Sequence, residues 1–334
     1  MGRFLTVVIL ILLASRSAVA AYSDAAAARE AVLSGSSEMS SEDRASALAL
    51  LKAEAERSPE DTETLRALVM ACEMNNDWDT GLPAARTLVE LAPDNADHQY
   101  LLGNALFSTI DDVSMFNKGA RASAGRKAYQ TAIKIDPTHV DARTGLFYFY
   151  MEAPGFAGGS TKKAKEIAEE IAGEPENMRV GNELLMALAA KQKDWDRYNE
   201  LLVETLDAVS EEDRATILLT ATYTALFHRK DYEAGLEYSQ RYRAAAGEGQ
   251  GGYTTNYFEG VALHGLGRYD EAVTKFEAVL AVHPEAKNTR WLAAESCEEL
   301  GRDAEAAAHY TEYAERFPED DKAKAAKKKV KRLR

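Results

Sequence analysis

Cysteine, proline and long apolar stretches are scarce in this sequence. Only 2 of the 334 residues are cysteine and 8 are proline, and runs of β-branched residues are nearly confined to the first twenty positions. Ala, Leu, Glu and Lys dominate the remainder, and these residues lose little side-chain freedom in a helix. The composition therefore predicts an all-α protein, and its length allows either two compact domains or one elongated array.

Constellations of residues that carry chemistry are also missing. The six histidines occur singly, and none stands at metal-ligand spacing from a thiol or carboxylate. No Gly-x-Ser-x-Gly motif and no plausible cysteine–histidine pair is present. The many acidic residues are spread as expected for solvated helix faces. We therefore predict that the protein is not an enzyme and holds no metal or other cofactor.

Basic residues are outnumbered, and they cluster at one end. The net charge is −14, and it becomes −16 without the first twenty residues. The last fourteen residues carry +7, which leaves −23 on the body of the chain. A body of that charge repels nucleic acid, so we expect no nucleic-acid partner. The basic end is interpreted as a solvated capping helix, and contact with phosphate or anionic lipid is the alternative.

Residues 1–20 have the features of an export signal. Arg3 precedes a short apolar core, Phe4 to Ala14, and the small residues Ala18 and Ala20 form a cleavage site. A membrane-spanning helix needs about 20 apolar residues, roughly twice this run. No cysteine lies near the cleavage site, so we do not expect export with a lipid-modified cysteine. We expect a periplasmic or secreted protein without stable membrane insertion after cleavage, an uncleaved anchor being the alternative.

A repeat of 34 residues runs through the chain. Residues 253–284 read YTTNYFEGVALHGLGRYDEAVTKFEAVLAVHP, and the following 34 residues repeat the pattern of small, aromatic and proline positions. The matching positions are Gly260, Gly267, Tyr269, Ala272, Phe276, Val279 and Pro284, followed by Ala294, Gly301, Ala306, Tyr310, Tyr313 and Pro318. This pattern resembles the tetratricopeptide repeat, in which small residues let two helices approach and a proline ends the second helix.

The resemblance covers nearly the whole chain after the signal. It implies an all-α, right-handed superhelical solenoid of antiparallel helical hairpins, of the kind found in exported bacterial repeat proteins. The divisions that we expect are a degenerate N-terminal hairpin at 21–59, repeats with two long inner loops at 60–246, a glycine-rich hinge at 247–252, two well-matched repeats at 253–318 and a basic capping helix at 319–334. Cys72 and Cys297 fall on inner packing faces several repeats apart, so we expect buried thiols and no disulfide.

One of the two inner loops has an unusual composition. Residues 146–160 read LFYFYMEAPGFAGGS, so an aromatic helix end runs into a Pro-Gly loop. A phosphate-binding loop needs a different spacing and a preceding strand. The helix start after the loop could bind an anion, or the glycines could only shape the turn. The loop is similar to one in exported repeat proteins, including the repeat subunit associated with tripartite periplasmic (TRAP) transporters. The candidate ligand-loop residues are Pro154, Gly155, Phe156, Gly158, Gly159 and Ser160.

In repeats of this family the first helices line a concave groove, into which positions 2, 5, 9, 12 and 13 project. Side chains at those positions are mostly aromatic or weakly polar here, as binding surfaces favour. The predicted groove residues are Tyr100, Asn104, Phe107, His139, Phe149, Tyr150, Phe227, His228, Tyr257, His264, Trp291, Glu295 and Glu298. A basic clamp for a peptide carboxylate is not found at these positions. The alternative is that packing buries several of these side chains.

Two functions remain open on this basis. The first is a cell-envelope scaffold or adaptor whose groove binds a partner polypeptide, with the acidic body favouring basic partners. The second is a periplasmic carrier or transporter accessory that binds a small hydrophobic ligand in a pocket near residues 147–156.

Overall fold

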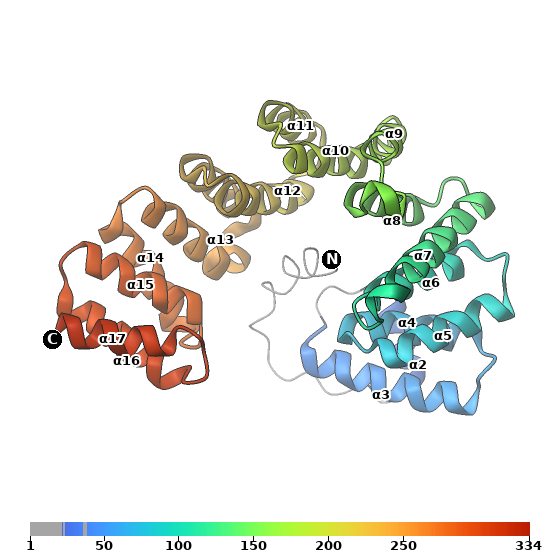
Figure 1. Cartoon of the computed structure of the whole chain (residues 1–334), viewed down its shortest axis with the longest axis horizontal. Coiled ribbons are helices and arrows are strands. Elements are labelled where there is room, and N and C mark those ends of the chain that lie inside the picture. The colour runs from blue at the N-terminus through green and yellow to red at the C-terminus, as the bar shows by residue number, and fades with distance from the viewer. Residues whose placement is uncertain (1–21, 23, 36–38) are drawn as a thin grey trace. The chain divides into compact units, whose positions relative to one another are not determined.

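The computed structural model describes residue 22, residues 24–35 and residues 39–334, except for the side chains of 212 and 248–251. The predicted signal at 1–20 lies outside the described residues. Every regular element in the described part is a helix, and no strand occurs there (Figure 1). The chain divides into two compact units, residues 1–192 and residues 193–334.

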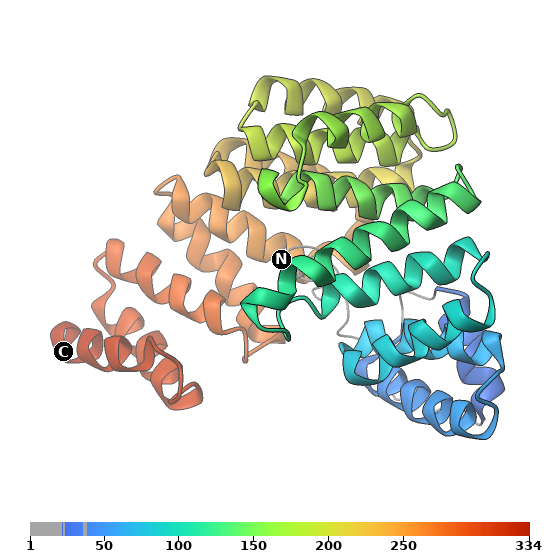
Figure 2. The ribbon, with the colours of Figure 1, turned by 45° about the vertical axis from the view of Figure 1, so that its right-hand side comes forward.

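The first unit is a series of helices in which sequence neighbours pack against each other, blue to green in Figure 2. Its elements are α2 (Ala25–Leu33), α3 (Ser41–Arg57), α4 (Thr62–Asn75), α5 (Trp78–Leu91), α6 (Ala96–Ser108), α7 (Met115–Ile135), α8 (Val140–Glu152), a short 3₁₀ turn η1 (Gly155–Ala157), α9 (Thr161–Ala172) and α10 (Met178–Gln192). The N-terminal hairpin predicted within 21–59 corresponds to α2 and α3, which pack on each other and on α4.

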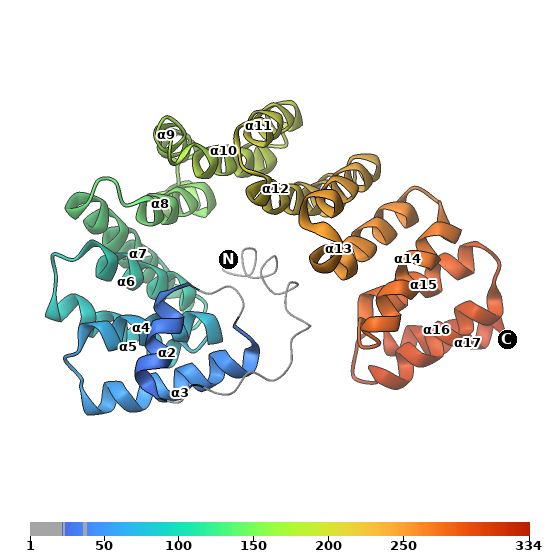
Figure 3. The same cartoon turned by 180° about the vertical axis from the view of Figure 1, so that it is seen from behind.

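The second unit continues the same pattern and ends in a short helix packed on its neighbour (Figure 3). Its elements are α11 (Trp195–Ala208), α12 (Glu211–Tyr223), a π-helical turn η2 (Thr224–Arg229), α13 (Tyr232–Gly265), α14 (Tyr269–Val282), α15 (Lys287–Glu299), α16 (Asp303–Arg316) and α17 (Ala323–Leu333). The predicted capping helix is α17.

Helix boundaries follow from capping residues in the sequence. The side chains of Asp61, Asp77 and Asn95 accept hydrogen bonds from backbone N–H groups in the first turns of α4, α5 and α6. Such bonds satisfy donors that have no partner inside the helix. Asn76 has φ 54° between α4 and α5, the left-handed conformation that ends one helix and turns the chain into the next.

Small residues facing aromatic rings set the spacing between hairpins. The ring of Tyr129 on α7 lies between Gly103 on α6 and Gly145 on α8, and a Cβ added at either glycine would overlap the ring. In the second unit the Phe276 ring packs against Gly260 in the same way. The aromatic position of the repeat thus fills space that only a glycine leaves open.

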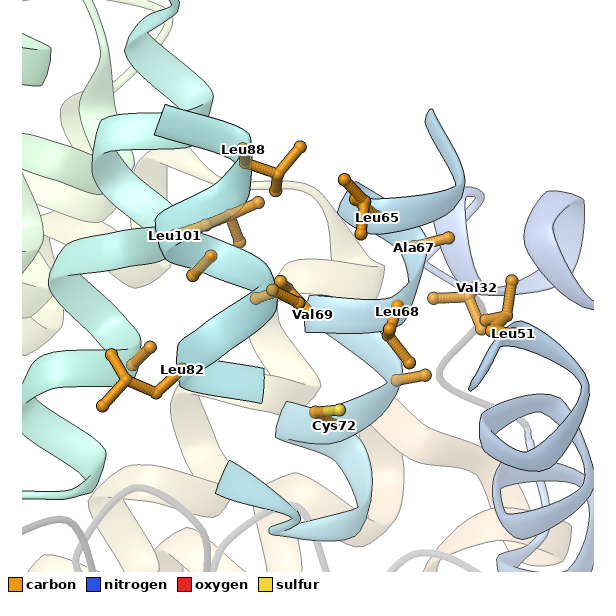
Figure 4. Close-up of a cluster of buried hydrophobic side chains, with 14 of the residues drawn as sticks. Val32, Leu51, Leu65, Ala67, Leu68, Val69, Cys72, Leu82, Leu88 and Leu101 are labelled. Carbon is orange, nitrogen blue, oxygen red and sulfur yellow. The ribbon is translucent and has the colours of Figure 1, made fainter. Parts of the chain in front are cut away.

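The hydrophobic core of the first unit begins where α2, α3, α4 and α5 pack together. Val32 and Leu51 of α2 and α3 meet Leu68 and Cys72 of α4 (Figure 4). On the other face of α4, Val69 points toward α5 and α6. Because α4 is buried on two faces, it links the first hairpin to the next one without a separate core for each hairpin.

Charged contacts join successive repeats at a sequence distance close to one period. Arg29 contacts Asp61 at 3.3 Å, Arg143 contacts Glu174 at 2.6 Å and Lys287 contacts Asp320 at 2.7 Å, with separations of 32, 31 and 33 residues. Arg143 is almost fully buried, so its charge requires the Glu174 carboxylate as a partner. These three ion pairs therefore link adjacent repeats.

Two segments between helices differ from the structure that the sequence predicts. The first of the two long inner loops expected within 60–246 falls around residues 108–123. It is shorter than expected, because α7 already begins at Met115 and the insertion mainly lengthens that helix to 21 residues. In the glycine-rich segment Gly247 leaves the helical conformation, with φ 73° and ψ 166°, so α13 consists of two helices that meet at a kink there. The hinge at 247–252 stays a prediction about motion.

We predict that Gly103→Ala lowers the free energy of unfolding by about 1–3 kcal/mol, since the new methyl group must displace the Tyr129 ring from a packed core. Urea denaturation followed by circular dichroism measures this. The matched control is Gly119→Ala in α7, where a Cβ meets no described atom within 4 Å. That control should stabilise the helix by about 0.5–1 kcal/mol. Equal effects of the two substitutions would contradict the packing argument.

Both thiols should be inert in the folded protein. Cys72 and Cys297 are free and buried, one in each unit. Burial raises the pKa of Cys72 to about 12 and that of Cys297 to about 11. Because the thiolate is the reactive form, we expect a thiol reagent such as Ellman's reagent to label neither cysteine at pH 8 until urea unfolds the chain. Rapid labelling of the native protein would show that a thiol is accessible.

Candidate functional site

The predicted groove residues of the first unit form one continuous group of rings across α6, α7 and α8. Tyr100 lies 5.3 Å from the His139 ring and 6.1 Å from the Tyr129 ring. Phe107 then stacks on Tyr129 at 5.4 Å and contacts Phe149 at 5.8 Å. Tyr129 thus connects the predicted residues, although it lies on α7, the second helix of its hairpin.

A hydrogen bond and burial divide this group into an inner and an outer part. The Tyr129 hydroxyl donates to Asn104 Oδ1 at 2.7 Å, and Tyr129 is buried. Phe149 and Tyr150 are also buried, at 6% and 7% exposure. Tyr100 and Asn104 are half-buried and keep surface toward solvent. Of the predicted set, Phe149 and Tyr150 therefore serve packing, and no partner can reach them without rearrangement.

Three carboxylates surround Tyr100. Burial is the largest cause that raises the pKa of Tyr100, to about 12, and a hydrogen bond with Asn104 opposes it. The negative charges of Asp141, Glu73 and Asp97 raise this pKa further. These residues come from α4, α6 and α8, so the field of three successive first helices converges on one hydroxyl. We call Glu73, Tyr100, Asn104 and Asp141 the inner-face cluster.

Glu73 is in an unusual environment. Its side chain is exposed, yet desolvation is the largest cause that raises its pKa, followed by the charge of Asp141. Desolvation of an exposed carboxylate fits a concave surface. We therefore take the inner-face cluster, which lies on the first helices of three successive hairpins, as the candidate hollow of the first unit.

The negative charge of this hollow is only partly compensated. Asp97 contacts Arg66 at 3.7 Å and His139 Nε2 at 3.2 Å. Glu73 and Asp141 form no ion pair with any residue that the structure describes. Two carboxylates that repel each other and lack a cation cost the fold stability, so a positively charged group from outside would be bound favourably here.

The Pro-Gly loop between α8 and α9 is closed on itself. The N–H groups of Ala157 and Gly159 donate to the Pro154 carbonyl, that of Gly158 donates to the Gly155 carbonyl, and that of Ser160 donates to Tyr150. The Ser160 hydroxyl caps α9 by accepting from the Lys163 N–H at 3.3 Å. An anion-binding loop needs free N–H groups. These four N–H groups are used inside the chain and are not free for an anion. The glycines shape the turn: Gly158 has φ 96°, and a Cβ on Gly159 would overlap a backbone carbonyl.

Phe156 at the tip of this loop is 97% exposed, so it points away from the protein. The Arg126 guanidinium lies over the Phe149 ring at 5.5 Å, and Lys163 lies over Tyr150 at 5.2 Å. The aromatic residues near the loop are thus covered by cationic side chains, and Phe156 offers an apolar contact on the surface rather than a pocket wall.

The predicted groove residues of the second unit do not form one group. Phe227 and His228 lie beside the Tyr223 ring at 4.9 and 5.5 Å, and both are exposed. Tyr257 is half-buried; burial raises its pKa to about 12, and Tyr253 and Tyr223 raise it further. These residues cluster where η2 meets α13.

The remaining predictions of that unit fall elsewhere. His264 bonds Ser296 at 2.9 Å, and desolvation lowers its pKa although Glu295 and Glu299 oppose this. Trp291 is buried at 8% exposure between Tyr310 and Tyr313, with Lys322 over its face at 4.7 Å. It serves the core and cannot act as an exposed anchor, contrary to the groove reading.

Sequence reasoning missed two residues of the inner-face cluster. Glu73 occupies position 12 of its repeat, the position of Phe107 and Phe149, so extending the positional rule to the preceding repeat finds it. Asp141 occupies position 4, which the rule does not include. Its role depends on the way α8 packs beside α6, and no local signal predicts that.

Within the described ranges, no group of three or more His, Cys, Asp and Glu side chains is placed to hold a metal ion. None of the helices in those ranges is long and apolar enough to cross a membrane.

Comparisons with known proteins agree with this architecture. The tetratricopeptide repeat family matches residues 74–140 and 259–321. The fold is similar to that of yeast Tom70, with 17% identity and a TM-score of 0.62 over 96% of this chain and 68% of that one. It is also similar to a chain of the APC/C hetero-tetramer Cut9–Hcn1, with 15% identity and a TM-score of 0.50 over 87% of this chain. This chain spans about half, 52%, of that second protein. Identities this low show the fold, an all-α helical repeat solenoid.

We predict that Glu73→Gln raises the free energy of unfolding by about 0.5 kcal/mol or less and so raises the thermal midpoint slightly. A raised carboxyl pKa means that the charged form is less favourable in the folded than in the unfolded chain, so neutralising it removes a cost present above that pKa. Thermal unfolding at pH 7 measures the gain, which should vanish at acidic pH where Glu73 is protonated. The control Glu90→Gln, an exposed residue of α5, should have no effect. Destabilisation by Glu73→Gln would contradict an uncompensated charge.

Proposed function

We propose that the chain, two segments of which match the tetratricopeptide repeat family, is a non-enzymatic scaffold that binds a partner polypeptide in the candidate hollow of its first unit. Repeats of this family typically form protein-interaction scaffolds, and the similar chain from Cut9–Hcn1 belongs to a hetero-tetramer. A similar fold does not identify the partner, whereas the charges at the site indicate its chemistry.

The observation that carries the proposal is the uncompensated charge of Glu73 and Asp141 beside the half-buried Tyr100. Between repeats the first unit also forms ion pairs, as Lys52 and Asp77 do at 2.5 Å, whereas Glu73 and Asp141 face each other without one. A lysine or arginine of a partner would restore neutrality in the hollow. It would also meet a tyrosine ring, which attracts cations to its face.

The partner that fits this site is an extended or helical segment with basic side chains. Long-range attraction by the acidic body would speed its approach, and the contacts in the hollow would determine its register. Phe156, fully exposed in the same unit, offers an additional apolar contact.

The N-terminal residues support placing this activity in the cell envelope, as a periplasmic or secreted protein. N-terminal sequencing of the chain recovered from an expressing bacterium tests that placement: a start at residue 21 supports export and cleavage, and an intact N-terminus contradicts it.

A small hydrophobic ligand near residues 147–156 is the competing function. The closed loop and the outward Phe156 favour the scaffold. Native mass spectrometry separates the two: a small molecule that co-purifies with the chain would favour the ligand-binding function.

We expect the double substitution Glu73→Gln and Asp141→Asn to reduce partner recovery about tenfold, since two charge contacts of up to about 1 kcal/mol each are lost. A pull-down from periplasmic extract, with the chain as bait and quantified by mass spectrometry, measures this. The control Glu90→Gln with Asp94→Asn makes the same change in net charge on α5 and beyond its end.

Recovery should also fall as pH is lowered through the raised pKa of Glu73, because protonation removes the charge that attracts the partner. If the double variant recovers the same proteins in the same amounts as the unchanged chain, the hollow is not the binding site.

A further inference from the structure

The C-terminal helix α17 distributes its positive charges over two sides. Ala323 and Ala326 are buried and Val330 and Leu333 are half-buried against the core of the second unit. Their spacing of three and four residues places them on one face. The cations must therefore lie on the flanks and on the outer face of the helix.

On one flank of α17 the cations form ion pairs with a carboxylate of α15. Lys329 contacts Glu298 at 2.9 Å, and Arg332 binds the other oxygen of the same carboxylate. The Tyr310 hydroxyl donates to Glu298 at 3.1 Å. These contacts hold α17 against α15 and α16.

The other side carries four lysines without counterions. Lys324, Lys327, Lys328 and Lys331 are exposed, and none forms an ion pair with any residue in the described part of the chain. Because they are spaced by three, one and three residues, they occupy a single face about 10 Å long. We call these four residues the lysine face.

We propose that the lysine face binds the surface of a phospholipid bilayer that contains anionic headgroups. A pocket for one phosphate or carboxylate would bring together a guanidinium fork and polar side chains. The lysine face instead presents a row of flexible point charges on a convex helix. Many diffuse phosphates satisfy such a row better than one bound group does.

This contact is peripheral and electrostatic. The apolar face of α17 is occupied by the second unit, so the helix does not insert into lipid. At physiological salt the acidic body is screened beyond about 8 Å, so it repels the bilayer less than the nearest lysines attract it. Binding is therefore weak and sensitive to salt.

The proposal is independent of partner binding in the first unit, because it depends on different residues in a different unit. Loss of vesicle binding with an unchanged pull-down, or the reverse, distinguishes a failure of one from a failure of the other.

Flotation of the full chain with vesicles tests the proposal. Vesicles of pure phosphatidylcholine report binding through the apolar N-terminal residues, and vesicles with 30% phosphatidylglycerol report the added effect of anionic headgroups. We expect the anionic vesicles to increase the bound fraction at 0.1 M salt and to lose this increment at 0.5 M. Each lysine contributes about fivefold, so the variant K324Q/K327Q/K328Q/K331Q should bind both vesicles alike.

The control variant K127Q/K134Q/K162Q/K165Q makes the same change in net charge on exposed lysines of α7 and α9. It should retain the increment. The proposal is overturned if the unchanged chain shows no increment, if both variants lose it equally, or if soluble polyglutamate binds the lysine face while anionic vesicles do not. The last outcome would identify an acidic polypeptide as the partner.

Discussion

The close fit of an aromatic ring between two glycines is the contact on which the rest of the structure depends. Tyr129 fills the space between Gly103 and Gly145, and this brings α6 and α8 to either side of α7. Tyr100, Phe107 and Phe149 meet as a result. A larger residue at either glycine would separate the helices and with them the carboxylates that converge on Tyr100. Packing and the candidate site therefore share one cause.

Charges form ion pairs at the joints between repeats, but they stay unpaired on two surfaces. At the joints, pairs such as Arg143 with Glu174 neutralise each other. In the hollow Glu73 and Asp141 remain uncompensated, and on α17 the lysine face does so with the opposite sign. Like charges that lie close together without a counterion cost stability, and a bound group of opposite charge relieves that cost. We propose partners of opposite charge for the two surfaces: a basic polypeptide for the first and an anionic bilayer for the second.

The candidate site could be predicted only in part. The positional rule found Tyr100 and Asn104 because their exposure follows from the geometry of one hairpin. It also selected Trp291, whose burial depends on Tyr310, Tyr313 and two lysines at and beyond the start of α17, Lys322 and Lys329. Phe149 is covered by Arg126 in the same way. Whether an aromatic residue binds or packs is decided by neighbours distant in sequence, and a repeat pattern does not contain that information.

The amino-acid sequence by itself determined the helical repeat, the aromatic and glycine positions that pack, and the helix ends, since caps, turns and spacing act within one period. It also determined where the charges concentrate. Only the tertiary structure decided which carboxylates remain unpaired, that desolvation and Asp141 raise the pKa of the exposed Glu73, and that the lysines of α17 divide between Glu298 and solvent. Those properties depend on distances between side chains of different helices, and such distances exist only after the repeats have packed.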